Sequence, residues 1–279
     1  MPKFIDCFTY FDEDLLLDIR LNTLNDVIDK FVICESTMTH QGSIKKLNFN
    51  IENFKKFKHK IIYLVKENLN IDEYRFKDEK IWDGSDIWFR EASQRNYLMK
   101  EINKFDDNDC IIISDLDEIP NPKLIKKNYS LKKNFYVFEQ TMYYYKLNYY
   151  VSSNWHGSRM CLKKYLKSPN WFHKNMQPKK KFWYNFKRSI KKIKNGGWHF
   201  SYLKSPEDIM KKLSSFSHYE FNTPEINNLA FIENSIKEGK DIFREIRPSL
   251  EQKIQICEIN KSYPSYIIDN INKFKNWIV

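Results

Sequence analysis

The order of apolar and polar positions in the first half of the chain predicts strands that alternate with helices. Short apolar runs typical of buried strands occur at 4–10, 31–35, 61–65, 110–114 and 136–138. Apolar residues recur at helical spacing between the first two runs, at Leu17, Leu21, Leu24 and Ile28. We expect Asp12 to cap this helix and a second helix to span 91–104. Such alternation is typical of an α/β fold with a mostly parallel sheet and helices on both faces.

The pattern becomes helical toward the C-terminus. Ser205 followed by Pro206 is typical of a helix start, because Ser caps the first turn and Pro fits into it. Helical spacing continues at 227–238. The sequence contains no internal repeat and no low-complexity linker, so we expect one domain over residues 1–279.

Two carboxylates follow the apolar run that begins at Cys110. Asp115 and Asp117 stand at i and i+2, and such positions share one face of an extended chain. They follow the carboxyl end of a predicted strand, where α/β sheets bind their ligands. The spacing therefore predicts a site for a divalent metal that would bridge a diphosphate. The alternative is an acidic turn that ends the strand before Pro120.

The net charge of +11 is distributed unevenly. Between Pro120 and His199 there are 19 Lys and Arg residues and one acidic residue, Glu139, so this stretch carries +18 and the rest carries −7. So basic a stretch needs an anionic partner or extensive solvation.

The basic segment 179–194 carries a helical pattern of its own. Its apolar residues at helical spacing are Phe182, Phe186, Ile190 and Ile193, with Gly196 and Gly197 after its end. Two interpretations stay open. The segment is either an interfacial helix on an anionic membrane, close to a lipid-linked acceptor, or a helix packed on its own domain with a solvated basic face.

The cysteines and the hydropathy bear on the compartment. The five cysteines form no CxxC pair, and three of them lie in strand-like apolar runs, which favours buried thiols in a reducing compartment. No stretch approaches the roughly 20 apolar residues of a membrane span, and the N-terminus lacks the pattern of a signal peptide. We expect a cytoplasmic protein, with peripheral membrane contact through 179–194 under the first interpretation.

Several short segments occur in order between residue 6 and about residue 210. They are 6–11, 24–29, 31–36, Glu91 with Gln94, Arg95 and Asn96, then 114–120, and 197–202 followed by Pro206 and Glu207. Together they resemble glycosyltransferase family 17, the family of the bisecting β-1,4-N-acetylglucosaminyltransferase. The resemblance implies a GT-A fold, a nucleotide-sugar donor, a divalent metal and an inverting transfer. It is weakest in the basic middle and beyond Ile209, the parts expected to choose the acceptor.

The resemblance also implies a metal site composed of Asp115, Asp117 and His199. Asp117 is expected to ligate the metal directly, and Asp115 to hold the donor ribose or the water shell of the metal. His199 stands where GT-A enzymes often supply a late histidine ligand. An imidazole among oxygen ligands suits Mn²⁺ better than Ca²⁺, and Mg²⁺ is the second choice. The alternative for His199 is a core histidine beside Trp198 and Phe200.

The expected donor-binding residues come from two further segments. Glu91, Gln94 and Arg95 share one face of a helix, where Arg95 could pair with a diphosphate or form an exposed salt bridge with Glu91. Glu35 and Ser36 end the second strand and could contact the nucleoside or cap a loop. With Asp115, these residues form the predicted donor site.

An inverting transfer also needs a general base that takes the proton of the acceptor hydroxyl. GT-A enzymes usually supply it between the metal motif and the late histidine, and beyond Glu118 that interval holds only Glu139. Glu139 is therefore the candidate, with Glu118, Glu207 and Glu220 as alternatives.

The resemblance implies one glycosyltransferase domain with three parts. They are a nucleotide-sugar-binding half at 1–120, a basic acceptor-side half at 121–204 and a helical extension at 205–279. The expected donor is a UDP-sugar, with N-acetylglucosamine as the favoured sugar, and the expected acceptor is a glycan or a lipid-linked saccharide.

Two alternative functions stay open. A sugar-phosphate nucleotidyltransferase usually has a Gly-rich loop near its first strand, and residues 6–13 contain no Gly. A nucleic-acid-binding protein would use 179–194, with Trp183 and Tyr184 as stacking platforms. We do not expect nucleic acid to be the partner.

Overall fold

The computed structural model describes residues 2–71, 73–74, 85–128, 134–178, 183, 189–248, 251 and 253–279. Within these residues the strands are β1 (Phe4–Thr9), β2 (Lys30–Ser36), β3 (Ile61–Lys66), β4 (Cys110–Ile113), β5 (Glu118–Pro120), β6 (Phe135–Tyr144), β7 (Tyr149–Leu162), β8 (Ile190–Ile193), β9 (Gly197–Ser201) and β10 (Gln255–Ile256). The fold class predicted from the sequence, an α/β fold with a helical C-terminal part, is confirmed.

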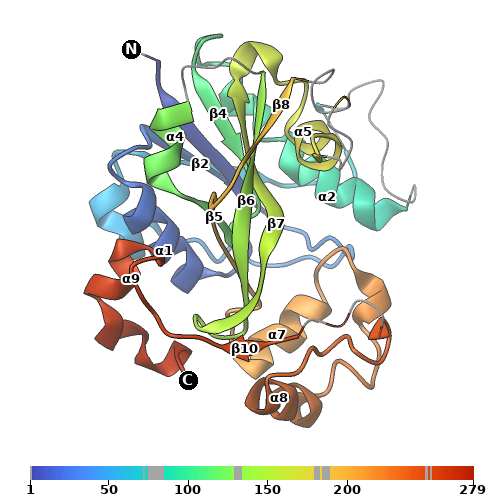
Figure 1. Ribbon diagram of the computed structural model, residues 1–279. Helices are drawn as coiled ribbons and strands as arrows, with labels where there is room; N and C mark the ends of the chain where they lie inside the picture. The colour runs from blue at the N-terminus through green and yellow to red at the C-terminus, as the bar shows by residue number, and fades with distance from the viewer. Residues whose placement is uncertain are drawn as a thin grey trace.

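The α-helices surround the sheet (Figure 1), and several short 3₁₀ helices occur between or after these elements. The α-helices are α1 (Asp14–Leu24), α2 (Asp86–Asn96), α3 (Met99–Ile102), α4 (Pro122–Asn128), α5 (Pro169–Asn175), α7 (Pro206–Leu213), α8 (Leu229–Glu238) and α9 (Ser265–Asp269). The 3₁₀ helices are η1 (Ile51–Phe57), η2 (Lys163–Tyr165), η3 (Tyr219–Phe221) and η5 (Ile271–Trp277). Among the described residues, no helix is both long and apolar enough to cross a membrane.

The described strands form one sheet with a parallel half and a mixed half. The strand order is β3-β2-β1-β4-β7-β6-β9-β5, with β10 beside β7 and β8 beside β6. From β3 to β4 the strands are parallel, as the alternation of strand and helix predicts. Beyond β4, the long strand β7 runs antiparallel to both of its neighbours β4 and β6. The parallel half therefore brings the carboxyl ends of β1, β2 and β4 to one edge.

Helices cover both faces of the sheet, so its central strands are apolar on both sides. In β1, Phe4 and Phe8 belong to the core under α1 and α9, whereas Ile5 and Cys7 belong to the core under α3 and α5. Figure 1 shows α1 and α9 on one side of the sheet and α2 and α5 on the other. A third core joins α7 and α8 to the far end of the β6–β7 hairpin. This continuous burial explains the uninterrupted apolar runs in the sequence.

Two helix starts were predicted from capping residues. Ser205 caps α7, and its side chain accepts a hydrogen bond from the Asp208 amide, as predicted. The prediction for Asp12 is wrong, because Glu13 occupies the N-cap position of α1 without a side-chain capping bond. Asp12 is instead paired with Lys204 and Lys211, and Lys211 Nζ lies 3.0 Å from Asp12 Oδ2. A salt bridge to a distant part of the chain thus replaces the local cap.

The helix predicted for 179–194 is wrong over its last part. Ile190–Ile193 forms β8, which pairs in parallel with β6. Residues at i and i+3 lie on opposite faces of a strand, and here Ile190 packs into one core and Ile193 into the other. Because both faces of the sheet are covered, a strand can also bury apolar residues at this spacing. The pattern that predicts a helix is therefore equally compatible with β8. Residues 179–182 and 184–188 lie outside the described residues.

Candidate active site

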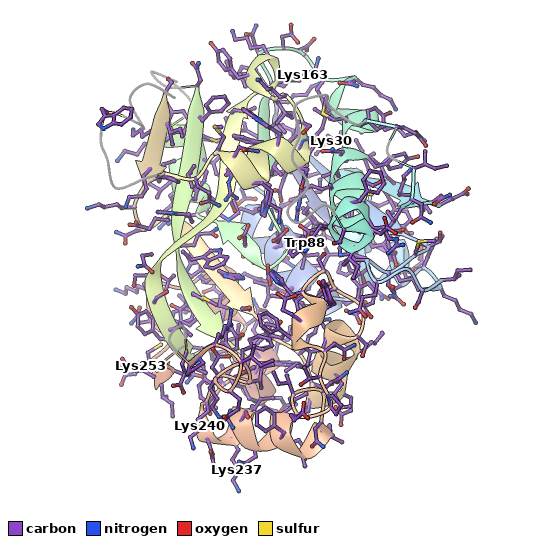
Figure 2. All side chains as sticks on the ribbon, turned by 90° about the vertical axis from the view of Figure 1, so that its right-hand side faces the viewer. Lys30, Trp88, Lys163, Lys237, Lys240 and Lys253 are labelled. Carbon is purple, nitrogen blue, oxygen red and sulfur yellow. The ribbon has the colours of Figure 1, made fainter. Side chains whose placement is uncertain are left out.

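A cleft of about 800 Å³ lies beyond the carboxyl ends of β1, β2 and β4. Its opposite wall consists of β7 residues and of the segment that follows α7, and Trp88, labelled in Figure 2, also lines it. Most of the residues predicted for the site line this cleft, namely Ser36, Glu91, Gln94, Arg95, Asp115, Asp117, Glu118 and His199. Glu35, Glu139 and Glu207 are not among the residues that line it.

Asp117 and His199 meet because β5 and β9 are paired. Glu118 faces His199 in this antiparallel pair, and the Phe200 amide donates a hydrogen bond of 3.0 Å to the Asp117 carbonyl. Gly197 makes the approach feasible, since its φ is +140° and a Cβ there would lie 2.1 Å from the Ile119 carbonyl oxygen. As a result, Asp117 Oδ2 lies 3.5 Å from His199 Nε2. Two ligand atoms that each lie about 2.1 Å from the same metal ion are separated by about this distance.

Asp117 and His199 each shift the pKa of the other side chain toward its charged form. Burial would lower the pKa of His199, but the Asp117 carboxylate outweighs burial and raises it above its usual value. Burial likewise would raise the pKa of Asp117, and His199 instead holds it below its usual value. Each shift favours the charged form of its own group, as expected for two side chains that attract each other. The other ring nitrogen of His199, Nδ1, is buried without a hydrogen-bond partner among the described residues.

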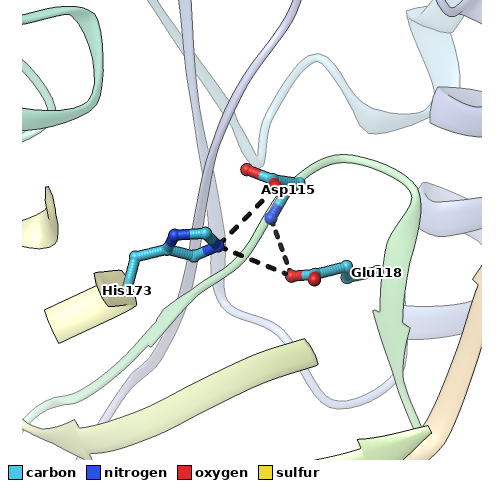
Figure 3. Close-up of side chains that lie close together, drawn as sticks. All are labelled: Asp115, Glu118 and His173. Carbon is cyan, nitrogen blue, oxygen red and sulfur yellow. Dashed lines mark hydrogen bonds and ion pairs between the residues drawn. The ribbon is translucent and has the colours of Figure 1, made fainter. Parts of the chain in front are cut away.

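A second group of potential ligands consists of Asp115, Glu118 and His173 (Figure 3). His173 Nε2 lies 3.6 Å from Asp115 Oδ2 and 4.0 Å from Glu118 Oε2. Burial and the nearby positive charge of Arg95 lower the pKa of His173 well below its usual value, so the imidazole is neutral and can offer a lone pair. The described residues provide no hydrogen-bond partner for either of its ring nitrogens. His173 was not predicted from the sequence, because the short helix α5 carries no recognisable motif.

Arg95 holds Asp115 in place within a buried ionic chain. Its Nη2 donates to Asp115 Oδ1 at 2.7 Å, and its Nη1 donates to Glu91 Oε1 at 2.7 Å. Lys174 Nζ lies 3.1 Å from the same Glu91 oxygen. Partial burial would raise the pKa of Asp115, but the positive charge of Arg95 at 2.7 Å holds it well below its usual value. The predicted salt bridge between Glu91 and Arg95 is present, and it is buried rather than exposed.

The other predicted donor-site residues differ in their surroundings. Gln94 lies in the cleft wall, where its Nε2 donates to the Cys34 carbonyl and its Oε1 contacts His40 Nε2 at 2.9 Å. Ser36 also lines the cleft. Glu35 is buried behind it and accepts hydrogen bonds from the amides of Asn48 and Phe49, at 2.7 and 3.0 Å. Of the two roles left open for Glu35, the geometry matches the capping of a loop.

The candidates for the general base also lie in different places. Glu118 is buried at the cleft, its Oε1 accepts a hydrogen bond of 2.7 Å from Trp155 Nε1, and burial followed by the charge of Asp115 raises its pKa. Glu139 pairs with Lys192 at 2.7 Å and lies 3.8 Å from His156 Nε2. Glu207 is exposed in the first turn of α7. Glu220 is exposed in η3 and is not among the residues that line the cleft. Glu118 is thus the candidate closest to the metal motif, and the roles of all four stay predictions.

Arg20 is a structural residue of the site that the sequence analysis missed. It is fully buried on α1, where it pairs with Asp6 of β1 at 2.6 Å. Its Nη1 donates to the carbonyl oxygens of Asp115, Leu116 and Glu118 at 2.9 to 3.0 Å. The guanidinium therefore determines the path of the loop that carries the carboxylates. The sequence does contain a signal for this pair. Asp6 stands inside an apolar strand, and Arg20 stands on the apolar helix that follows.

The sequence matches one protein family over nearly its whole length. Glycosyltransferase family 17 matches residues 2–278. The human β-1,4-mannosyl-glycoprotein 4-β-N-acetylglucosaminyltransferase is 32% identical over 113 residues, which are 38% of this chain and 19% of that protein. The Rattus norvegicus protein matches equally. The match thus spans about a fifth of the length of these relatives.

Solved structures show a more distant likeness. Glucosyl-3-phosphoglycerate synthase from Mycobacterium tuberculosis, in complex with Mn²⁺, uridine diphosphate and phosphoglyceric acid, is 7% identical to this chain. The similarity covers 96% of this chain and 91% of that one, with a TM-score of 0.33. The family match, in contrast, extends over nearly the whole sequence. The chain therefore belongs to glycosyltransferase family 17.

Proposed function

We propose that this glycosyltransferase is metal-dependent and inverting, and that it moves a sugar from a nucleoside-diphosphate donor to a glycan or lipid-linked acceptor. The observation that carries the proposal is the approach of Asp117 Oδ2 to His199 Nε2, at 3.5 Å, in the cleft of a family 17 chain. The names of the curated relatives favour N-acetylglucosamine as the sugar and a mannosyl residue in the acceptor. A uridine nucleotide is the proposed carrier.

The residues present fit a divalent metal. Asp117 is ionised, and His199 turns a ring nitrogen toward it in a buried setting. Asp117 and His199 would hold the ion, and one imidazole among oxygen ligands favours Mn²⁺. When bound, such an ion would neutralise the charge that develops on the leaving diphosphate. Asp115, Glu118 and His173 are the competing ligand set.

The remaining residues would orient the substrates and move the proton. Arg95 holds Asp115 toward the cleft, and Asp115 would accept a hydrogen bond from the donor. Glu118 would take the proton of the acceptor hydroxyl, because it lines the cleft and its pKa is raised toward the working pH. A raised pKa makes this carboxylate a stronger base than an ordinary one.

A screen of nucleotide sugars tests this proposal. We expect one donor, UDP-N-acetylglucosamine first, to be hydrolysed slowly with Mn²⁺ and not in excess chelator. Asp117→Asn should lower this rate about 10²-fold to 10³-fold, since several kcal/mol of charge stabilisation would be lost. The matched control is Asp107→Asn, which alters an exposed carboxylate outside the cleft lining. Full activity of the Asp117 variant, or activity that is unchanged in excess chelator, would contradict the proposal.

A further inference from the structure

One part of β7 differs from the rest of that strand. Residues 153–155 are exposed, whereas residues 157–162 are buried. The pairing of β7 with β6 is irregular here, with register shifts between Val137 and Glu139 and between Gln140 and Met142. Such irregularities redirect side chains that a regular strand would point to alternate faces. Four residues line the cleft together and form what we call the β7 shelf, namely Ser152, Asn154, Trp155 and His156.

Trp155 is the largest side chain of the β7 shelf and contacts the reaction centre. Its indole Nε1 donates to Glu118 Oε1 at 2.7 Å. Its ring lies 4.7 Å from the His199 ring, between centroids, at an interplanar angle of 32°. Although these contacts hold it, the side chain is still 40% exposed. Part of the indole therefore faces the cleft and is available to a ligand.

The composition of the β7 shelf matches the chemistry of a sugar ring. A pyranose has an apolar face of C–H groups, which packs well against an indole, and hydroxyl groups around its edge. Asn154 and Ser152 line the same cleft as Trp155, and they could offer an amide and a hydroxyl to such an edge. An aromatic surface with a few convergent polar groups is the usual composition of a small-molecule subsite.

The position of the β7 shelf separates it from the expected donor nucleotide. The residues at the ends of β1 and β2 line one side of the cleft, and β7 lies beyond β4 on the other side in the strand order. Trp155 reaches Glu118 and His199 from that second side. A ring seated on the indole would therefore bring a hydroxyl group toward Glu118.

We infer that the β7 shelf is the acceptor subsite and that Trp155 is the platform for the acceptor pyranose. This inference rests on the proposed glycosyl transfer and adds the substrate side of the cleft to it. The indole has two roles, because its face carries the sugar while its N–H holds the carboxylate proposed as the base. The platform and the proposed base are thus joined by one hydrogen bond.

The test uses the full chain with UDP and Mg²⁺, which avoids the paramagnetic broadening caused by Mn²⁺. The probes are methyl α- and β-pyranosides of mannose, glucose, galactose and N-acetylglucosamine. We follow the ¹⁵N-labelled indole N–H resonance of Trp155, assigned by its loss in Trp155→Phe. At least one glycoside should shift this resonance. Trp155→Ala lacks this resonance, so its affinities are measured by calorimetric titration: the same glycoside should bind about tenfold more weakly, as expected for a central aromatic anchor, while the affinity for UDP changes less than about threefold.

Matched variants make the result specific. Asn154→Ala should weaken glycoside binding, whereas Ser153→Ala should leave it unchanged, because Ser153 is exposed beside Asn154 but does not line the cleft. If Trp155→Ala does not fold, Trp155→Phe replaces it. That variant keeps the stacking surface, so glycoside binding should change less than about threefold, while donor hydrolysis falls as Glu118 loses its N–H donor.

Three outcomes would overturn the acceptor subsite. The first is that no glycoside shifts the Trp155 resonance. The second is that Trp155→Ala loses as much affinity for UDP as for the glycoside. The third is that Ser153→Ala loses as much glycoside affinity as Trp155→Ala. The proposed function is judged separately, by metal-dependent donor hydrolysis in the unaltered protein. The subsite can therefore fail while that hydrolysis persists.

Discussion

The loop that carries the carboxylates and the β7 shelf line one cleft, but they are constructed differently. Residues 114–118 are tied down by buried charge, since Arg20 binds three of their carbonyl oxygens and Arg95 holds Asp115. The β7 shelf lies where strand pairing is irregular and includes the exposed Asn154 and Trp155. The first region has its geometry before any ligand binds. The second is partly exposed, so exposed side chains such as Asn154 can change at little cost to the fold, which suits the choice of acceptor.

The strongest test of this contrast is at the proposed base. Glu118→Gln should lower transfer about 10²-fold to 10⁴-fold, the usual contribution of a positioned general base. Glu139→Gln and Glu207→Gln should retain nearly full activity, because neither residue is among those that line the cleft. Measurements of kcat on the donor found in the screen decide between them. An equal loss in Glu139→Gln would return the role to that residue, acting through the adjacent His156.

The buried pair beneath the loop can be broken directly. Arg20→Met should lower the free energy of unfolding by about 3 to 5 kcal/mol, since Asp6 and the loop carbonyls lose a buried donor. Adding Asp6→Leu should recover part of this loss, because no charge then stays unpaired. Urea denaturation measures both.

An exposed salt bridge provides the control for the Arg20 experiment. Lys55 and Glu52 are 71% and 57% exposed, so Lys55→Met should change the stability by less than about 1 kcal/mol. If Arg20→Met behaves like this control, the loop is not held by the buried charge, and the contrast with the β7 shelf fails.

Metal affinity shows which histidine beside the carboxylate loop binds the ion. In the presence of UDP, His199→Ala should weaken Mn²⁺ binding about 10-fold to 100-fold, and His173→Ala should change it much less. Both histidines are buried or nearly so, which makes them a matched pair. Titration of Mn²⁺ with calorimetric detection compares the variants. The reverse ranking would move the ion to the group formed by Asp115, Glu118 and His173.

The smallest effect on the chemical step is expected from the basic segment 179–194. Changing Lys187, Arg188 and Lys191 to Glu should leave donor hydrolysis within about twofold, because the segment lies outside the sequence motifs assigned to the donor and the metal. Lys192 is left intact, since it pairs with Glu139. Binding to vesicles containing phosphatidylserine should weaken by about 1 kcal/mol for each basic residue lost, if the segment contacts membranes. Unchanged vesicle binding would remove the proposal of peripheral membrane contact.

Local patterns in the sequence predicted much of the parallel half. The observed bounds of β1, β2, β3 and β4 agree closely with the apolar runs, and the Ser205 cap of α7 is confirmed. These features depend on neighbouring residues along the chain, so periodicity and capping suffice to locate them. The carboxylates Asp115 and Asp117 were found in the same way, because their spacing and the strand before them are local.

Only the tertiary structure decided which distant residues complete the site. His173 reaches Asp115 from α5, Trp155 reaches Glu118 from β7, and Arg20 supports the loop from α1. Each contact joins segments far apart in the chain and depends on how the sheet is ordered, which no local pattern contains. The same reason explains β8, where pairing with β6 outweighed a helical spacing of apolar residues. Sequence thus determined the carboxylates and the strand that carries them, whereas packing of the β6–β7 hairpin against that strand determined what surrounds them.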